Sequence, residues 1–126
     1  MKLRTIAGLY AIAVSIFMFW IWMYFAITNT VPFFEERPLE MSLHIAAEMM
    51  TCMALLAGGI GLLKSISWGR SVYFLGMGML AYALVNSPGM YVESGMTLMA
   101  AVFPPSLIVA VVFIVVPLIK MAKDDF

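Results

Sequence analysis

Charge and cysteine are both scarce in this sequence. Only 11% of its 126 residues are charged and 64% are hydrophobic, whereas a soluble domain carries about 25% charged residues. The seven basic and seven acidic residues balance, so no excess of positive charge indicates a nucleic-acid partner. Cys52 is the only cysteine, which excludes an internal disulfide. One small core could not hide this much apolar surface from water, so we expect lipid to be the solvent for most of it.

Signatures of catalysis are also missing from the sequence. It has no nucleophile elbow, no H-E-x-x-H motif, no glycine-rich phosphate loop and no pair of cysteines. An intramembrane enzyme is therefore the least favoured of the functional classes. No linker or soluble segment is long enough to fold alone, so we expect a single domain over residues 1–126.

Four apolar stretches are long enough to cross a bilayer, which takes about 20 helical residues. We expect these spans at about residues 5–28, 39–63, 71–87 and 96–119. The first stretch is too long for the apolar part of a signal peptide and lacks a cleavage site of small residues, so we expect it to be retained. The sequence therefore predicts an all-α integral membrane protein, a four-helix bundle.

Prolines mark several of the expected helix ends. Pro38 suits the first turn of the second span, because its missing N–H needs no partner there. Pro88-Gly89 is a strong stop signal, and it predicts a tight turn after the third span.

The fourth stretch is ambiguous because Pro104-Pro105 lies inside it and removes backbone hydrogen bonds. One interpretation is a single helix over residues 96–119 that bends or breaks close to residue 103. The other is a span that begins at Pro104 and follows a short surface helix over residues 90–103.

The basic residues predict the orientation in the membrane. Six of the seven fall on one side of a four-span arrangement: Lys2, Arg4, Lys64, Arg70, Lys120 and Lys123. The excess of Lys and Arg in cytoplasmic loops then places both termini in the cytoplasm of a multi-pass cell-membrane protein. Trp20, Trp22 and Tyr24 are expected to form an aromatic belt at the outer surface. The tail over residues 120–126 is expected to be solvated.

One polar stripe runs along the second expected helix. At ~100° per residue, Glu40, His44, Glu48 and Thr51 share a narrow face. Glu48 lies ~12 Å further along the helix than Glu40, which places it inside the apolar part of the bilayer. Ionisable residues at such depth face the bundle interior or a watery cavity and are functional-site candidates by default.

Three chemistries fit this stripe. His44, Glu48 and Glu40 could share a divalent metal ion, because side chains one turn apart point the same way. The same residues could relay protons, since histidine titrates near neutrality. Alternatively, His44 and Glu48 form a purely structural pair that holds helices together. A metal site needs further ligands, because the chain has no second histidine. The candidates that could complete or roof the pocket are Asn86, Tyr91 and Glu93, or a second copy of the chain.

The second expected span also carries a pattern of small residues. Ala54 and Gly58 are four residues apart, as are Ala57 and Gly61. Small residues at this spacing allow close approach of two helices. The pattern leaves open whether the partner helix belongs to the same chain or to a second copy.

Two short strings carry a resemblance. The first is His44-Ile45-Ala46-Ala47-Glu48-x2-Thr51 in the second helix, and the second is Asn86-Ser87-Pro88-Gly89-x-Tyr91 after the third. With them, the chain resembles small, uncharacterised prokaryotic membrane proteins of four spans. The resemblance covers most of the chain and implies the four-helix architecture, but it implies no activity for any residue.

The preferred functional hypothesis is a membrane protein that binds a metal ion, a proton or a small polar ligand. The site would be an outward-facing pocket within the membrane, and the role would relate to transport. The alternative is a structural or accessory subunit of a larger membrane complex, in which the His–Glu pair is structural. The expected partners are the lipid bilayer and either further copies of the chain or another membrane protein.

Overall fold

The structure is a computed structural model that describes residues 2–126. All regular structure in this range is helical: α1 (Leu3–Ile27), α2 (Pro38–Leu63), α3 (Gly69–Glu93), α4 (Thr97–Ala100) and α5 (Phe103–Ala122). The expected all-α fold is confirmed. Three segments are long and apolar enough to cross a membrane, namely Leu3–Ile27, Pro38–Leu63 and Thr97–Ala122.

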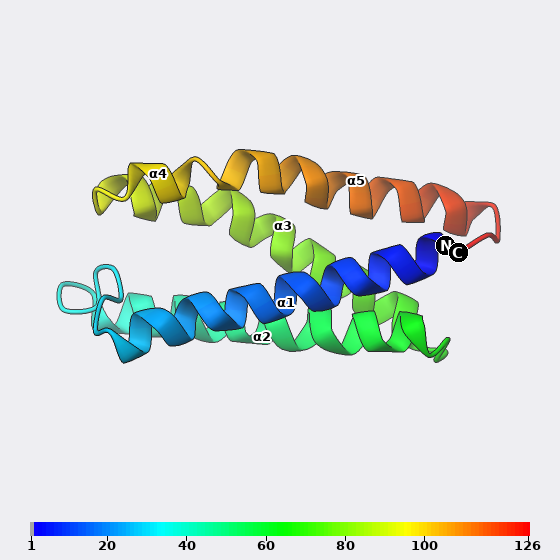
Figure 1. Cartoon of the computed structure of the whole chain (residues 1–126), viewed down its shortest axis with the longest axis horizontal. Coiled ribbons are helices and arrows are strands. Elements are labelled where there is room, and N and C mark those ends of the chain that lie inside the picture. The colour runs from blue at the N-terminus through cyan, green and yellow to red at the C-terminus, as the bar shows by residue number, and fades with distance from the viewer. Residues whose placement is uncertain (1) are drawn as a thin grey trace.

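The helices run roughly parallel to one long axis, as Figure 1 shows. α1 packs mainly on α2, α2 on α3, and α3 on α4 and α5, whereas contact between α1 and α5 is slight. α3 therefore crosses the middle of the bundle and joins the α1–α2 pair to the α4–α5 layer (Figure 1). Both chain ends lie together, and we call that end the terminal end. The opposite end, with the α1–α2 and α3–α4 connections, is the loop end.

Glycines allow close backbone contact near the terminal end. A Cβ atom on Gly58 would lie 2.6 Å from backbone atoms of Tyr73 in α3, and one on Gly61 would lie 2.7 Å from the Cα of Gly69. On another face of α2, a Cβ on Gly59 would lie 2.7 Å from the carbonyl oxygen of Gly8 in α1. These distances are too short for any side chain. The small-residue pattern of α2 therefore serves packing within the chain.

The third helix is longer than predicted. It runs from Gly69 to Glu93 with Pro88 inside it, so the helix continues beyond the expected end at residue 87 and the expected turn at Pro88-Gly89 is wrong. Proline removes one backbone donor, but the helix can continue where neighbouring helices enclose it. Ser87 and Tyr91, on either side of Pro88, are both buried, which shows that this part of α3 is packed.

The fourth stretch breaks where its tandem prolines predict. α4 ends at Ala100 and α5 begins at Phe103, so the expected bend or break close to residue 103 is confirmed. Pro104 and Pro105 cannot donate to the carbonyls of Ala100 and Ala101, so the helical hydrogen bonding is interrupted there, although Ala101 and Val102 keep right-handed helical dihedral angles. Pro38 begins α2, also as predicted.

A second proline effect links α3 to α5. Pro117 lies inside α5 and cannot donate to the carbonyl of Phe113, four residues before it. The hydroxyl of Tyr73 donates to that carbonyl oxygen at 2.6 Å. A fully buried side chain of α3 therefore satisfies the acceptor that the proline leaves free.

Two expectations about surface residues are wrong. Trp20 and Tyr24 are exposed, but Trp22 is only 6% exposed and packs inside the bundle. The last residues of the chain are not simply solvated either. Phe126 is buried against the rings of Tyr73 and Phe74, and its carbonyl oxygen accepts a hydrogen bond from Arg4 at 2.8 Å.

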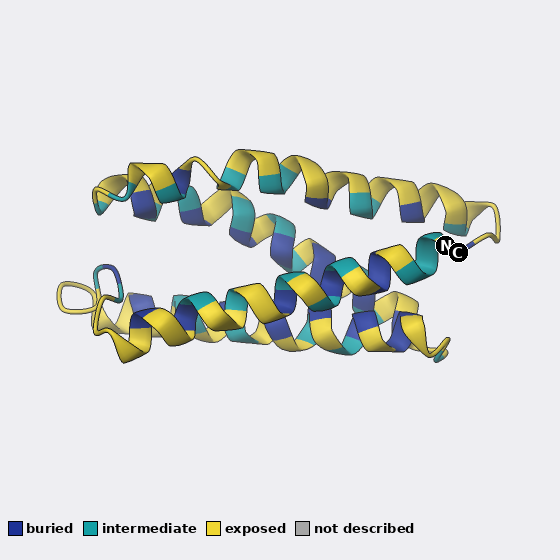
Figure 2. Cartoon of the chain, in the orientation of Figure 1, coloured by how far each residue is buried: buried dark blue, intermediate teal, exposed yellow. Residues whose placement is uncertain are grey.

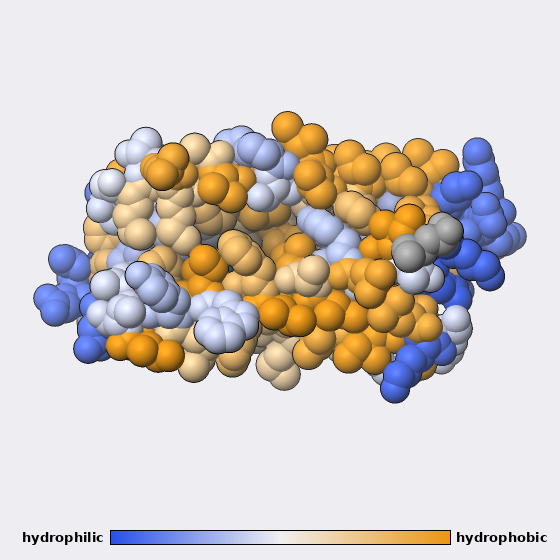
Figure 3. Space-filling view, in the orientation of Figure 1, coloured by the Kyte–Doolittle hydropathy of each residue, from blue (hydrophilic) through white to orange (hydrophobic). Residues whose placement is uncertain are grey.

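The surface divides into an apolar band and two polar ends. Figure 3 shows hydrophobic residues along the flank of the bundle and hydrophilic residues at both extremities. Most of the outward surface of α5 is exposed (Figure 2), and only 11% of the most apolar part of the Thr97–Ala122 segment is buried. An apolar surface left open on this scale requires lipid or a protein partner to cover it.

Candidate functional site

The polar stripe of α2 turns inward at its centre. Glu48 is buried, with 9% of its surface exposed, and the side chain of His44 is 17% exposed. Glu48 therefore lies inside the bundle, as predicted, whereas His44 is only partly buried. Nε2 of His44 lies 3.3 Å from Oε2 of Glu48, one helical turn away. The two atoms are not aligned for a hydrogen bond, and Nε2 has no other hydrogen-bond partner among residues 2–126.

Trp22 of α1 packs against this pair. Its ring centroid lies 5.9 Å from that of His44, with an angle of 69° between the planes. An edge-to-face contact of this kind restricts the rotation of the imidazole and shields one side of it from solvent. Trp22 therefore belongs to the environment of the pair.

A second buried polar group without a hydrogen-bond partner in the described part of the chain lies in α3. Ser87 is 1% exposed, and within residues 2–126 its Oγ has no hydrogen-bond partner. Nε2 of His44 and Oγ of Ser87 are therefore both buried polar atoms without a hydrogen-bond partner among residues 2–126. Such atoms are rare in folded proteins and call for water or a ligand.

The remaining members of the stripe behave differently. Glu40 is exposed near the loop end, and its carboxylate lies 3.9 Å from Arg37. Thr51 is buried, but its hydroxyl donates to the carbonyl oxygen of Ala47 in its own helix at 2.9 Å. Neither residue therefore makes a hydrogen bond to His44 or Glu48.

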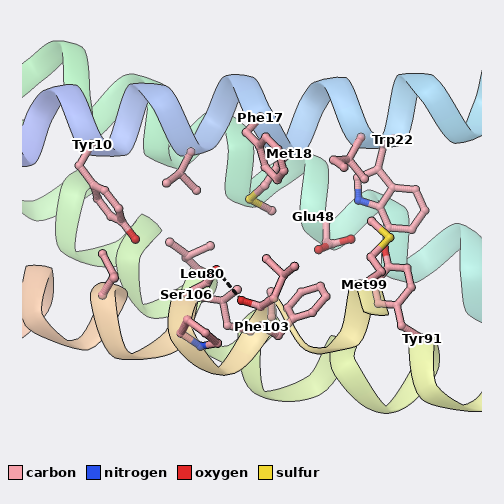
Figure 4. Close-up of a pocket in the computed structure, with 17 residues that line it drawn as sticks. Tyr10, Phe17, Met18, Trp22, Glu48, Leu80, Tyr91, Met99, Phe103 and Ser106 are labelled. Atoms are coloured by element: carbon pink, nitrogen blue, oxygen red, sulfur yellow. Dashed lines mark hydrogen bonds between the residues drawn. The ribbon is translucent and has the colours of Figure 1, made fainter. Parts of the chain in front are cut away.

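A cavity of about 380 Å³ lies between α1 and α5, with Glu48 in its wall. Figure 4 shows the carboxylate pointing into this cavity, with Trp22 of α1 on one side and Phe103 of α5 on the other. Tyr91 of α3 lines the same space. We call it the α1–α5 cavity.

A second hollow lies between α2 and α3, with a volume of about 500 Å³. His44, Glu48, Thr51 and Asn86 all line it, and we call it the α2–α3 groove. Glu48 lines both spaces, whereas His44 lines only the groove. The carboxylate is therefore reachable from two separate hollows.

The structure places only some of the residues that were predicted to cover the pocket close to the His44–Glu48 pair. Asn86 is exposed and reaches the α2–α3 groove, and Tyr91 is buried beside the α1–α5 cavity. Glu93 is exposed at the end of α3 and lies outside both spaces. Tyr91 reaches its position because α3 continues through Pro88; a turn there would have carried it away.

This arrangement gives a metal site limited support. Among residues 2–126, no group of three His, Cys, Asp or Glu side chains is placed to hold a metal ion. His44 and Glu48 provide two ligands, and Glu40 does not join them. Structural zinc sites take four protein ligands and catalytic ones three. A metal ion here would need a ligand from outside the chain.

Trp22 is a site residue that sequence reasoning missed. Trp22 was interpreted as part of a surface belt, although it continues a buried line in α1 that includes Ala7, Ala11, Ser15 and Phe25. That helical spacing is the signal that could have placed it inside. Ser87 was assigned to a turn because of Pro88, and no local signal corrects that assignment.

The fold and the site together define an all-helical bundle with three helices apolar enough to cross a membrane and a buried His–Glu pair. The chain belongs to the family described as a domain of unknown function, DUF8058, which it matches over residues 1–125. No curated protein and no solved structure matches the chain. The expected similarity to an uncharacterised family is confirmed in that form.

Proposed function

We propose that the chain is an integral membrane protein with four transmembrane helices and both termini in the cytoplasm. The apolar flank and polar ends of the bundle support this arrangement (Figure 3). α3 is less apolar than the other long helices, but its 25 residues give it a length of ~37 Å, enough to cross the ~30 Å apolar layer. Neighbouring helices cover much of α3, so it needs less apolar surface of its own.

The orientation is supported by where the charges lie. Lys2, Lys64 and Arg70 adjoin helix ends at the terminal end, whereas Glu36 and Glu93 are at the loop end. The excess of basic residues marks the cytoplasmic side. Cysteine labelling from outside the cell tests this in a Cys52→Ala background. We expect Glu36→Cys and Ser94→Cys to be labelled and Lys64→Cys to be protected; labelling at position 64 would reverse the topology.

We further propose that His44 and Glu48 form a proton-exchanging ligand site that contributes to transport. The observation that carries this proposal is the buried carboxylate of Glu48, 3.3 Å from Nε2 of His44 and open to two hollows. Lipid offers no hydrogen-bond partner, so a buried ionisable pair must share a proton or bind a polar ligand. A ligand with a donor group or a positive charge would compete with the proton for the carboxylate.

Trp22 provides a direct reporter of this pair. In a Trp20→Phe, Trp68→Phe background, Trp22 is the single tryptophan, and it packs on His44. A charged imidazole quenches indole fluorescence, so we expect fluorescence to change as pH moves between about 5 and 8. The change should disappear in His44→Gln, and its midpoint should move in Glu48→Gln. A signal that is insensitive to pH, or a midpoint unaffected by Glu48→Gln, would overturn the proton-exchange role.

A second candidate function is a structural subunit of a larger membrane complex. The open outward surface of α5 favours it, because a protein partner could cover that surface as well as lipid (Figure 2). In that case Glu48→Gln should be nearly silent, and His44→Ala should only lower thermal stability in detergent. The Trp22 titration separates the two functions, since a purely structural pair need not exchange its proton near neutral pH.

A further inference from the structure

We propose that the α1–α5 cavity binds a lipophilic organic cation, with the positive centre of the ligand at Glu48. This inference rests on the proposed function, because it requires the carboxylate to exchange its proton for the ligand. It goes further by naming the class of ligand and the route by which the ligand enters.

The cavity is shaped for an apolar molecule. Its wall is formed mainly by hydrophobic side chains from α1, α3, α4 and α5, and among residues 2–126 Glu48 is the sole carboxylate in it. Its polar hydroxyls come from Tyr10, Tyr91 and Ser106, and the last donates to the carbonyl oxygen of Val102 at 2.9 Å. A volume of about 380 Å³ falls within the ~300–1,000 Å³ range of small-molecule pockets.

Aromatic rings surround the carboxylate and favour a cation. Trp22, Phe103 and Tyr91 line the cavity with Glu48, and the last two rings stack with their centroids 5.4 Å apart. The face of an aromatic ring attracts a positive charge, and cages of aromatic rings bind quaternary ammonium groups. A carboxylate among aromatic rings therefore offers a cation both charge and polarisable surface.

The charges around the cavity exclude an anionic ligand. The wall contains no Lys, Arg or His among residues 2–126, and His44 faces the α2–α3 groove instead. An anion in this space would lie beside Glu48 without a compensating charge, and such burial is costly. A cation would neutralise the carboxylate in the same medium.

The entry route follows from the packing of the helices. α1 and α5 touch only slightly, and the cavity lies between them. In the proposed orientation this gap opens toward the lipid. A lipophilic cation concentrates in the membrane, so it can reach Glu48 sideways without crossing the polar ends of the bundle.

The test uses two ions of the same shape and opposite charge. Equilibrium binding of tetraphenylphosphonium and tetraphenylborate is measured on the full chain in detergent. We expect the phosphonium ion to bind at least about tenfold more tightly than the borate ion. Glu48→Gln should remove this preference, because it removes the charge while keeping the shape. Glu36→Gln, which removes an exposed carboxylate in the α1–α2 connection, is the matched control and should change nothing.

A second variant separates binding in the cavity from the state of the His–Glu pair. Ser106→Phe fills the cavity from α5, and Figure 4 shows Ser106 in the part of the cavity away from Trp22. It should abolish phosphonium binding and leave the Trp22 titration intact, with a melting temperature near that of the unmodified chain. Equal binding of both ions, or phosphonium binding that survives Ser106→Phe, would overturn the cation proposal. If Glu48→Gln left the midpoint of the Trp22 fluorescence titration unchanged, the proposed function itself would be overturned.

Discussion

The two halves of α2 are packed in opposite ways. Toward the terminal end, Gly58, Gly59 and Gly61 bring the backbones of α1 and α3 against α2, and no room is left for a side chain. Toward the loop end, His44 and Glu48 lie between two hollows. One helix can therefore pack tightly in one half and line a site in the other. Small residues allow close contact with α1 and α3 in the first half, and larger side chains keep the neighbouring helices further away in the second.

This difference explains why the polar residues are confined to one half. Close backbone packing excludes water and ligands, so a carboxylate placed among the glycines would have no partner. In the loop-end half, large side chains such as Trp22 and Tyr91 separate the helices and line the spaces beside Glu48. We therefore expect substitutions in the two halves to fail for different reasons.

The largest effect is expected from Trp22→Ala in the loop-end half. The substitution leaves a void beside His44 and should lower the free energy of unfolding by roughly 3 kcal/mol, the low end for deletion of a large buried aromatic side chain. In the proposed membrane arrangement the low end applies, because lipid would provide no hydrophobic driving force between helices. Thermal melting in detergent measures it. Trp20→Ala is the control, because 67% of the surface of Trp20 is exposed. Equal losses in both variants would show that Trp22 is not packed inside.

The next largest effect should come from Gly58→Ala in the terminal-end half. Its new methyl group would lie 2.6 Å from backbone atoms of Tyr73, and overpacking of this kind costs about 1–3 kcal/mol. Gly89→Ala in α3 is the matched control, because a Cβ there meets nothing within 4 Å. We expect Gly89→Ala to be neutral or slightly stabilising, since alanine favours helix more than glycine does. A Gly58→Ala variant as stable as Gly89→Ala would contradict the close α2–α3 contact.

A smaller effect is expected where the anchored half meets α5. Tyr73→Phe removes the hydrogen bond to the carbonyl oxygen of Phe113 and should cost about 1 kcal/mol. In a Pro117→Ala background, the new backbone N–H can satisfy that carbonyl, so Tyr73→Phe should cost less there. A double-mutant cycle on thermal stability measures the coupling. Strict additivity of the two substitutions would show that the tyrosine does not compensate for the proline.

The smallest effect should come from the N-terminal start of α2, at the loop end. Arg37 and Glu40 are both exposed, with their charged atoms 3.9 Å apart, and exposed pairs of this kind contribute about 0–1 kcal/mol. Arg37→Gln should therefore leave both thermal stability and the Trp22 titration unchanged. A shift of the midpoint of the Trp22 titration in Arg37→Gln would mean that the start of α2 takes part in the site.

Several features could be predicted from the sequence because their causes are local. The lengths of the first, second and fourth apolar stretches, the helix start at Pro38 and the break before Pro104 follow from hydropathy and from the missing N–H of proline. The shared face of His44 and Glu48 follows from helical periodicity alone. These properties depend on residues within one or two turns of each other, so no knowledge of neighbouring helices is needed.

The rest was decided by the tertiary structure, because it depends on how each helix is rotated against the next. The close contact of Gly8 with Gly59 fixes the rotation of α1, and this rotation turns Trp22 inward and leaves Trp20 outside. Enclosure by other helices lets α3 continue past Pro88, which brings Tyr91 to the α1–α5 cavity. Phe126 folds back because aromatic rings of α3 offer it a surface. Hydropathy and periodicity describe one helix at a time, whereas a cavity exists only between several.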